Sequence, residues 1–269
     1  MIPEILTYDF MQRAFAAGII IGIIAPTVGV FMVLRKLSLI GDSLAHTAFA
    51  GIAIGLFLNI VPFWSAIFFT ILSALGIVKL RESSKISGDA ALGIFFSAGL
   101  AIGIIVLSIT PNANINISNI FFGSILTITY QDLILIAFFG IIVLAITYFF
   151  YNSFLSITLD EELARTSGLP VHRLNYLLLV LVSLVIVSSM RIIGILLVSS
   201  LIIIPAVISI QISRSFRETT LIAIIIGIAS VLIGLSLSFY GNIPSGASIT
   251  FVNILIFCFV IIFKKLLDY

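Results

Sequence analysis

The chain has 269 residues, of which 61% are hydrophobic and only 9% are charged. A soluble domain carries about 25% charged residues, so this composition excludes a protein whose surface lies mainly in water. The single cysteine, Cys258, excludes an internal disulfide and a zinc site built from several cysteines. The apolar runs are continuous and do not alternate, which predicts an all-α, polytopic transmembrane helix bundle.

Nine apolar runs are candidates for membrane-crossing helices. Several are shorter than the roughly 20 residues that a perpendicular helix needs, so both eight and nine crossings fit the sequence. We interpret Ile115–Thr129 as an external re-entrant or surface helix, and we expect residues 1–269 to form a single transmembrane domain. The nine runs are Phe10–Leu34, Ile40–Ile60, Val61–Leu80, Ala90–Ile109, Leu133–Phe150, Leu174–Ser189, Ile192–Ile210, Leu221–Leu237 and Ile249–Phe263.

The placement of basic residues indicates an orientation. If the end of the first run at Arg35 and Lys36 is cytoplasmic, alternation of nine crossings places eleven of the thirteen basic residues on that side. Only Arg13 and Arg191 fall near the opposite face, and Arg191 is expected to snorkel outward or to line a pathway. The bias therefore predicts an external N-terminus and a cytoplasmic C-terminus.

Asp42 and His46 lie four residues apart within the second run, in the string GDSLAHTAFAG. On a helix this spacing places both side chains on one face, one turn apart. A carboxylate at mid-membrane costs roughly 2.5–3.5 kcal/mol, which favours a functional role over a pair that only neutralises itself. Imidazole and carboxylate suit a divalent transition ion such as zinc or manganese. Water, Ser43, Thr47, backbone carbonyls or a second subunit would have to complete the site.

The longest polar insert, Asn152–Asn175, is predicted to be cytoplasmic. Within it, Asp160–Thr166 predicts a short helix with acids in its first turn, which Gly168 and Pro170 terminate. The residues alone leave a docking surface for a partner and a solvated connector equally open. Two other acids precede apolar runs and are interpreted as helix N-caps, namely Asp89 and Asp132.

Glycines recur at four-residue spacing in three runs, which predicts close contacts between helices. These pairs are Gly18/Gly22, Gly51/Gly55 and Gly99/Gly103.

Since no lysine follows a glycine, the sequence contains no Walker A motif, and an ATPase would have to be a separate chain. We therefore expect a protein that is not itself an enzyme, holds no permanent cofactor and binds no nucleic acid.

Five segments in order, running nearly end to end, resemble the permease subunits of bacterial ABC transporters for zinc, manganese or iron. They are FMQRAFAAG, VLRKLSLIGDSLAHTAFAG, FGSILTIT, LDEELARTSGLPVHRLNYLLL and MRIIGILLVSSLIIIP. The resemblance implies a homodimeric permease in the plasma membrane, with two cytoplasmic ATP-binding subunits and an extracellular metal-binding protein. Zinc or manganese would be the transported substrate.

The resemblance also implies roles for individual residues. The metal-contacting aspartate and histidine of the family correspond to Asp42 and His46. The loop that couples the permease to its ATPase corresponds to residues 160–170, and its expected contacts are Glu161, Glu162, Gly168 and Leu169.

Many manganese-type members carry His-x-x-Leu-Pro-Gly at the position that here reads HTAFAG over residues 46–51. The missing proline makes the sequence more similar to the zinc branch and leaves manganese as an alternative. Two other hypotheses remain open: a proton-coupled carrier that uses the Asp42/His46 pair as a relay, and an ABC permease for an organic ligand such as chelated iron.

Overall fold

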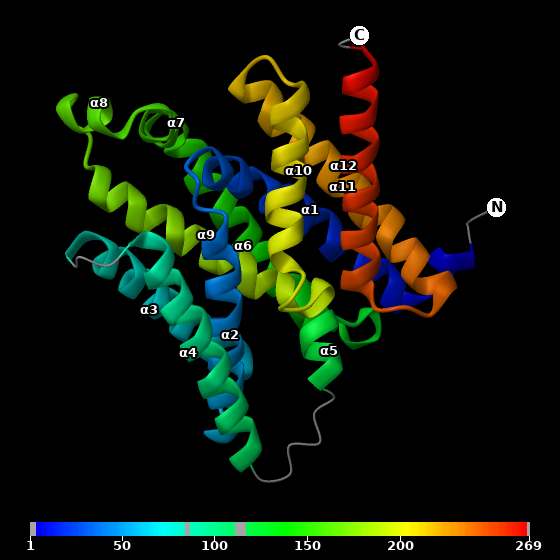
Figure 1. Ribbon diagram of the computed structural model, residues 1–269. Helices are drawn as coiled ribbons and strands as arrows, with labels where there is room; N and C mark the ends of the chain where they lie inside the picture. The colour runs from blue at the N-terminus through cyan, green and yellow to red at the C-terminus, as the bar shows by residue number, and fades with distance from the viewer. Residues whose placement is uncertain (1–3, 84–86, 111–116, 268–269) are drawn as a thin grey trace.

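The computed structural model describes residues 4–83, 87–110 and 117–267. In these ranges the chain is helical and contains no strand (Figure 1). The elements are η1 (Glu4–Thr7), α1 (Asp9–Leu34), α2 (Leu39–Phe57), α3 (Pro62–Ser83), α4 (Gly88–Ile109), α5 (Ile117–Phe122), η2 (Ile125–Thr127), α6 (Tyr130–Phe149), α7 (Tyr151–Leu159), α8 (Glu161–Thr166), α9 (Val171–Ile193), α10 (Val198–Ile212), α11 (Phe216–Gly241) and α12 (Ser245–Leu267).

Eight helices of the described chain are long and apolar enough to cross a membrane: α1, α2, α3, α4, α6, α9, α11 and α12. The remaining predicted run, Ile192–Ile210, is divided, because α9 continues to Ile193 and Gly194 breaks the helix at a φ of 84°. Most of the run beyond this break belongs to α10, an apolar helix of 15 residues. At 1.5 Å per residue it is roughly 22 Å long, against a bilayer core of about 30 Å.

The predicted segment Ile115–Thr129 contains no long helix in its described part, residues 117–129. It consists of the short α5 and η2, and residues 115 and 116 lie outside the described ranges. Backbone hydrogen bonds join α5 to the link before α10: the Ile195 N–H donates to Ile120 O at 3.1 Å, and the Leu196 N–H donates to Phe121 O at 3.2 Å. The non-helical link is thereby supplied with the partners that buried backbone requires.

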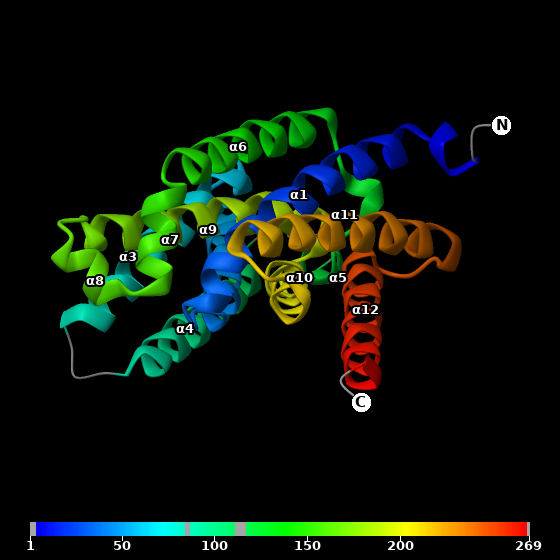
Figure 2. The same cartoon turned by 90° about the horizontal axis from the view of Figure 1, so that it is seen from above.

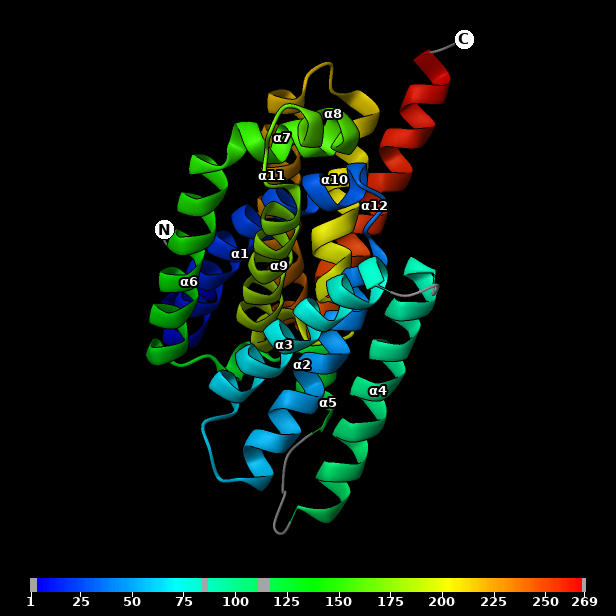
Figure 3. The ribbon, with the colours of Figure 1, turned by 90° about the vertical axis from the view of Figure 1, so that its left-hand side faces the viewer.

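The helices form a bundle in which α1 and α9 occupy the middle. Figures 2 and 3 place α6 on one side of these two helices, and α4 and α12 on the other. This arrangement leaves α2 packed between α4, α3, α9 and α10, so that it is mostly buried.

The three glycine pairs make the close contacts that their spacing predicts. Gly18 and Gly22 pack on α11, Gly51 and Gly55 pack on α3, and Gly99 and Gly103 of α4 pack on α2. A Cβ added to Gly99 would lie 2.7 Å from the carbonyl carbon of His46, so only a glycine allows α4 to approach α2 this closely.

Two N-cap predictions are wrong. Ser87 caps α4 by accepting a hydrogen bond from the Ala90 N–H at 3.3 Å, and Asp89 lies in the first turn. Thr129 caps α6, and Asp132, at the third helical position, completes a capping box with it. Ser87 lies two positions before Asp89, and Thr129 lies three positions before Asp132. In each helix the hydroxyl residue, and not the acid, occupies the N-cap position.

Arg191 makes an ion pair that the sequence analysis did not predict. Its Nη1 donates to Asp132 Oδ2 at 2.6 Å, and the same oxygen accepts from the Thr129 N–H and hydroxyl. The arginine therefore ties the end of α9 to the start of α6. The side chain of Asp132 is 8% exposed, so this pairing neutralises a nearly buried carboxylate.

Candidate metal site and coupling loop

Asp42 and His46 both lie on α2, as predicted. Asp42 occupies the first turn of the helix and is half-buried, whereas His46 lies one turn later and is only 6% exposed. The two side chains are neighbours on the helix surface because of their i, i+4 spacing. One chain thus supplies one carboxylate and one imidazole at adjacent depths.

The surroundings of His46 leave one ring nitrogen available. Its imidazole packs against the Phe96 ring of α4 with centroids 4.1 Å apart, and its backbone is pressed against Gly99. Its Nδ1 is buried and has no hydrogen-bond partner among the described residues. Because buried polar atoms are normally paired, an unpaired imidazole nitrogen is an atom suited to a ligand.

The pair does not form a closed site within one copy. The described residues contain no group of three or more His, Cys, Asp or Glu side chains that could hold a metal ion. The neighbouring hydroxyls donate to backbone carbonyls, Ser43 to Leu92 O at 3.0 Å and Thr47 to Leu44 O at 2.9 Å. A tetrahedral zinc ion needs four ligands, so at least two must come from elsewhere.

The predicted cytoplasmic helix is present as α8. Asp160 caps it by accepting from the Leu163 N–H at 2.9 Å, and acids fill its first turn. Gly168, at a φ of 83°, reverses the chain after the helix, and the Leu169 N–H closes the turn on Ala164 O at 3.1 Å. The polar insert contains one further helix that the sequence did not predict, α7.

The four predicted coupling residues divide into two groups. Glu162 and Gly168 are exposed, whereas Leu169 is half-buried and packs against the hydrophobic core. Glu161 is half-buried and faces the protein. Leu163, which the sequence analysis did not single out, is 66% exposed on this short acidic helix.

The structure brings Glu161 to Arg35, which connects α1 to α2. Arg35 Nη2 lies 2.9 Å from Glu161 Oε2, and the arginine side chain is only 9% exposed. Burial lowers the pKa of Arg35, and the adjacent Glu161 carboxylate opposes this shift. The pair links α8 to the turn that leads into α2, the helix that carries Asp42 and His46. No sequence pattern indicates this pair, since the partners lie 126 positions apart.

Comparison with known proteins identifies the family. The model of the ABC 3 transport family matches residues 7–264, which include α2 and α8. The chain belongs to the ABC 3 transport family. It is therefore a component of a membrane transport system, in agreement with the resemblance carried by the five segments.

The relatives of this ABC 3 chain are similar over nearly their whole length. It is 33% identical to the high-affinity zinc uptake system membrane protein ZnuB of Haemophilus influenzae, covering 93% of this chain and 96% of that one. It is 34% identical to the manganese transport system membrane protein MntC of Listeria monocytogenes, covering 96% and 92%. The solved structure of PsaBC from Streptococcus pneumoniae in complex with Fab matches with a TM-score of 0.87 at 31% identity, covering 97% and 95%.

Proposed function

We propose that this ABC 3 chain is the permease subunit of an ATP-driven importer for a divalent metal ion, with zinc as the substrate and manganese as the alternative. The observation that carries the proposal is the buried Nδ1 of His46, which has no hydrogen-bond partner in the described part of the chain, with Asp42 one turn before it on α2. The whole chain acts as one permease domain. It receives the ion from an extracellular binding protein and releases it to the cytoplasm.

The ligand types support a transition-metal substrate. A neutral imidazole and a carboxylate suit zinc and manganese better than magnesium or calcium, which prefer all-oxygen sites. The relatives are named for zinc and for manganese uptake, so similarity alone does not separate the two ions. The lack of proline in the HTAFAG string favours zinc. An incomplete site also suits passage, because a tightly held ion cannot leave.

We infer that a second copy of the chain completes the site. Two copies around a central axis supply two Asp42 carboxylates and two His46 imidazoles, which is the number of ligands a tetrahedral ion requires. This is supported by the half-exposed Asp42 and by the outer face of α4, the helix that covers His46. That face presents large apolar side chains to its surroundings, including Ile102 and Ile105.

ATP-binding subunits would act on the permease through α8. Glu162 and Leu163 offer an exposed surface for docking, while Glu161 passes movement of α8 to Arg35 and so to the start of α2. Asp42 and His46 follow Arg35 by seven and eleven residues in the sequence. In this scheme the C-terminus, with Lys264 and Lys265, is cytoplasmic.

The energy source tests the proposal. The permease would be reconstituted into proteoliposomes with its ATP-binding subunits, and uptake of radioactive zinc and of manganese delivered by the binding protein would be measured with and without internal ATP. We expect zinc uptake that requires ATP hydrolysis and persists when an ionophore collapses the proton gradient. Uptake that depends on the proton gradient without ATP would instead establish the carrier hypothesis.

A further inference from the structure

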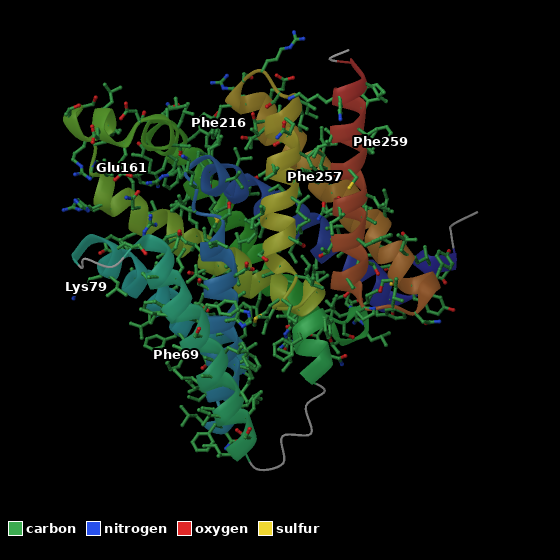
Figure 4. All side chains as sticks on the ribbon, viewed as in Figure 1. Phe69, Lys79, Glu161, Phe216, Phe257 and Phe259 are labelled. Carbon is green, nitrogen blue, oxygen red and sulfur yellow. The ribbon has the colours of Figure 1, made fainter. Side chains whose placement is uncertain are left out.

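A second cluster of charged groups surrounds a cavity of about 380 Å³ beside α8. The cavity lies between the end of α3, the turn from α1 to α2, the helices α7 and α8, and the start of α9. Figure 4 labels Glu161 and Lys79, from α8 and α3, at the same outer edge of the molecule. The cavity therefore lies at the perimeter of the bundle, where membrane-spanning helices begin and end.

The charges that line this cavity do not balance. Three guanidinium groups, those of Arg35, Arg81 and Arg165, face a single carboxylate, that of Glu161. Arg35 and Arg165 both contact this carboxylate, at 2.9 and 3.4 Å. The lining residues thus leave an excess of positive charge. Burial lowers the pKa of Arg35, and the positive charge of Arg81 lowers it further.

One of these guanidinium groups has an unsatisfied donor. The side chain of Arg35 is more than nine-tenths buried, and its Nη1 has no hydrogen-bond partner among the described residues. The amide oxygen of Asn175, which also lines the cavity, is buried and unpartnered too. A buried donor without an acceptor is unfavourable, so an anion that supplies an acceptor to Nη1 would stabilise this arginine, whose Nη2 is already held by Glu161.

The rest of the lining is mixed: Thr158, His172 and Asn175 are polar, and the other residues are apolar. Leu37, Val78, Leu178 and Leu179 form an apolar wall against which the charged groups stand. An inorganic anion would use only the guanidinium groups, whereas an amphipathic anion would use both parts of the lining. Basic pockets between helix ends on the cytoplasmic side of membrane proteins are the places where anionic lipid headgroups bind.

We propose that this cavity binds the phosphate of an anionic phospholipid from the cytoplasmic leaflet. The phosphate oxygens accept charge-assisted hydrogen bonds from Arg35 Nη1 and from the guanidinium groups of Arg81 and Arg165. The glycerol backbone and the first methylene groups lie on the apolar wall. The lipid would then contact α8 and the α1–α2 turn together and so hold the coupling helix against the bundle.

Native mass spectrometry of the full-length permease in detergent tests the proposal. The protein would be titrated with phosphatidylglycerol, with phosphatidylcholine of the same acyl chains, and with inorganic phosphate. The variant carries Arg81→Gln and Arg165→Gln, and the control carries Arg214→Gln and Arg217→Gln, which remove the same charge from the loop before α11 and the first turn of that helix. We expect the wild type and the control to bind one phosphatidylglycerol at least tenfold more tightly than phosphatidylcholine. The variant should lose this preference.

The melting temperature without added lipid shows whether each variant is folded, and Arg165→Gln alone provides a milder second variant at a site 60% exposed. Equal retention of phosphatidylglycerol by wild type and both variants would overturn the proposal. Equally tight binding of inorganic phosphate would assign the cavity to a free anion and overturn the lipid as its source. If lipid binding is unchanged but the variant releases the ATP-binding subunits, the cavity receives an acidic protein side chain instead. Each result is independent of which metal is transported.

Discussion

The chemistry of His46 depends on an atom with no partner. Its buried Nδ1 lacks a hydrogen bond among the described residues, and Asp42 is the nearest acid on the same helix face. Both residues were identified from the sequence, because a carboxylate and an imidazole at helical spacing are rare in an apolar run. Phe96 was not, since nothing in its surroundings marks it as the residue that covers His46.

We predict that Asp42→Asn and His46→Ala each reduce metal uptake by tenfold or more, because each removes a ligand from a site that has few. Uptake in proteoliposomes and membrane insertion would be measured side by side. Thr47→Val serves as a control, since the Thr47 hydroxyl donates to its own helix. Wild-type uptake by both ligand variants would remove the metal site from the proposal.

Substitution of Gly99 tests the close contact of α2 with α4. Gly99→Val would place a Cβ 2.7 Å from the backbone of His46, which neither helix can avoid without moving. Overpacking of this kind costs roughly 1–3 kcal/mol, so we expect a melting temperature lower by several degrees. Gly93→Val is the matched control on the same helix, because no atom lies within 4 Å of its added Cβ. Equal melting temperatures for the two variants would contradict the contact.

Among the elements, the long apolar helices were predictable and their ends were not. Continuous apolar runs identify a membrane helix, but its first turn depends on a cap such as Ser87 or Thr129, and each of these has an acid nearby that the sequence offers for the same role. The break at Gly194 escaped prediction because an apolar stretch continues on both sides of it. The acidic helix α8 was predictable, since Asp160 and Gly168 supply local start and stop signals.

The Arg35–Glu161 pair is the contact between elements that sequence reasoning could not find, and charge exchange tests its role. We expect Arg35→Glu and Glu161→Arg each to weaken metal-stimulated ATP hydrolysis by the reconstituted complex, while the double exchange restores much of it. The two sites should show a coupling energy of about 0.5–3 kcal/mol. Lys36→Gln removes a neighbouring charge without breaking the pair and should have little effect. Additive losses in the double variant would show that the pair does not transmit movement.

Across the whole molecule, the bias of basic residues predicts which loops face the cytoplasm. We expect Ser167→Cys, in the turn after α8, to react with a membrane-impermeant maleimide only after cells are permeabilised. Ile60→Cys, between α2 and α3, should react in intact cells. Both positions are exposed, and Cys258, which is also exposed, would first be replaced by serine. The reverse labelling pattern would invert the predicted orientation.

The packing of α1 on α11 has a consequence for how the protein is made. Gly22 meets Gly227, a residue that the ribosome adds 205 positions later. At ordinary translation speeds, roughly 10–40 s pass before the first helix meets this neighbour. During that interval the small-residue face of α1 has only lipid or the insertion machinery to contact. In a chain truncated before α11, the small-residue face of α1 would never gain its contact with α11. We expect membrane proteases to degrade such a chain.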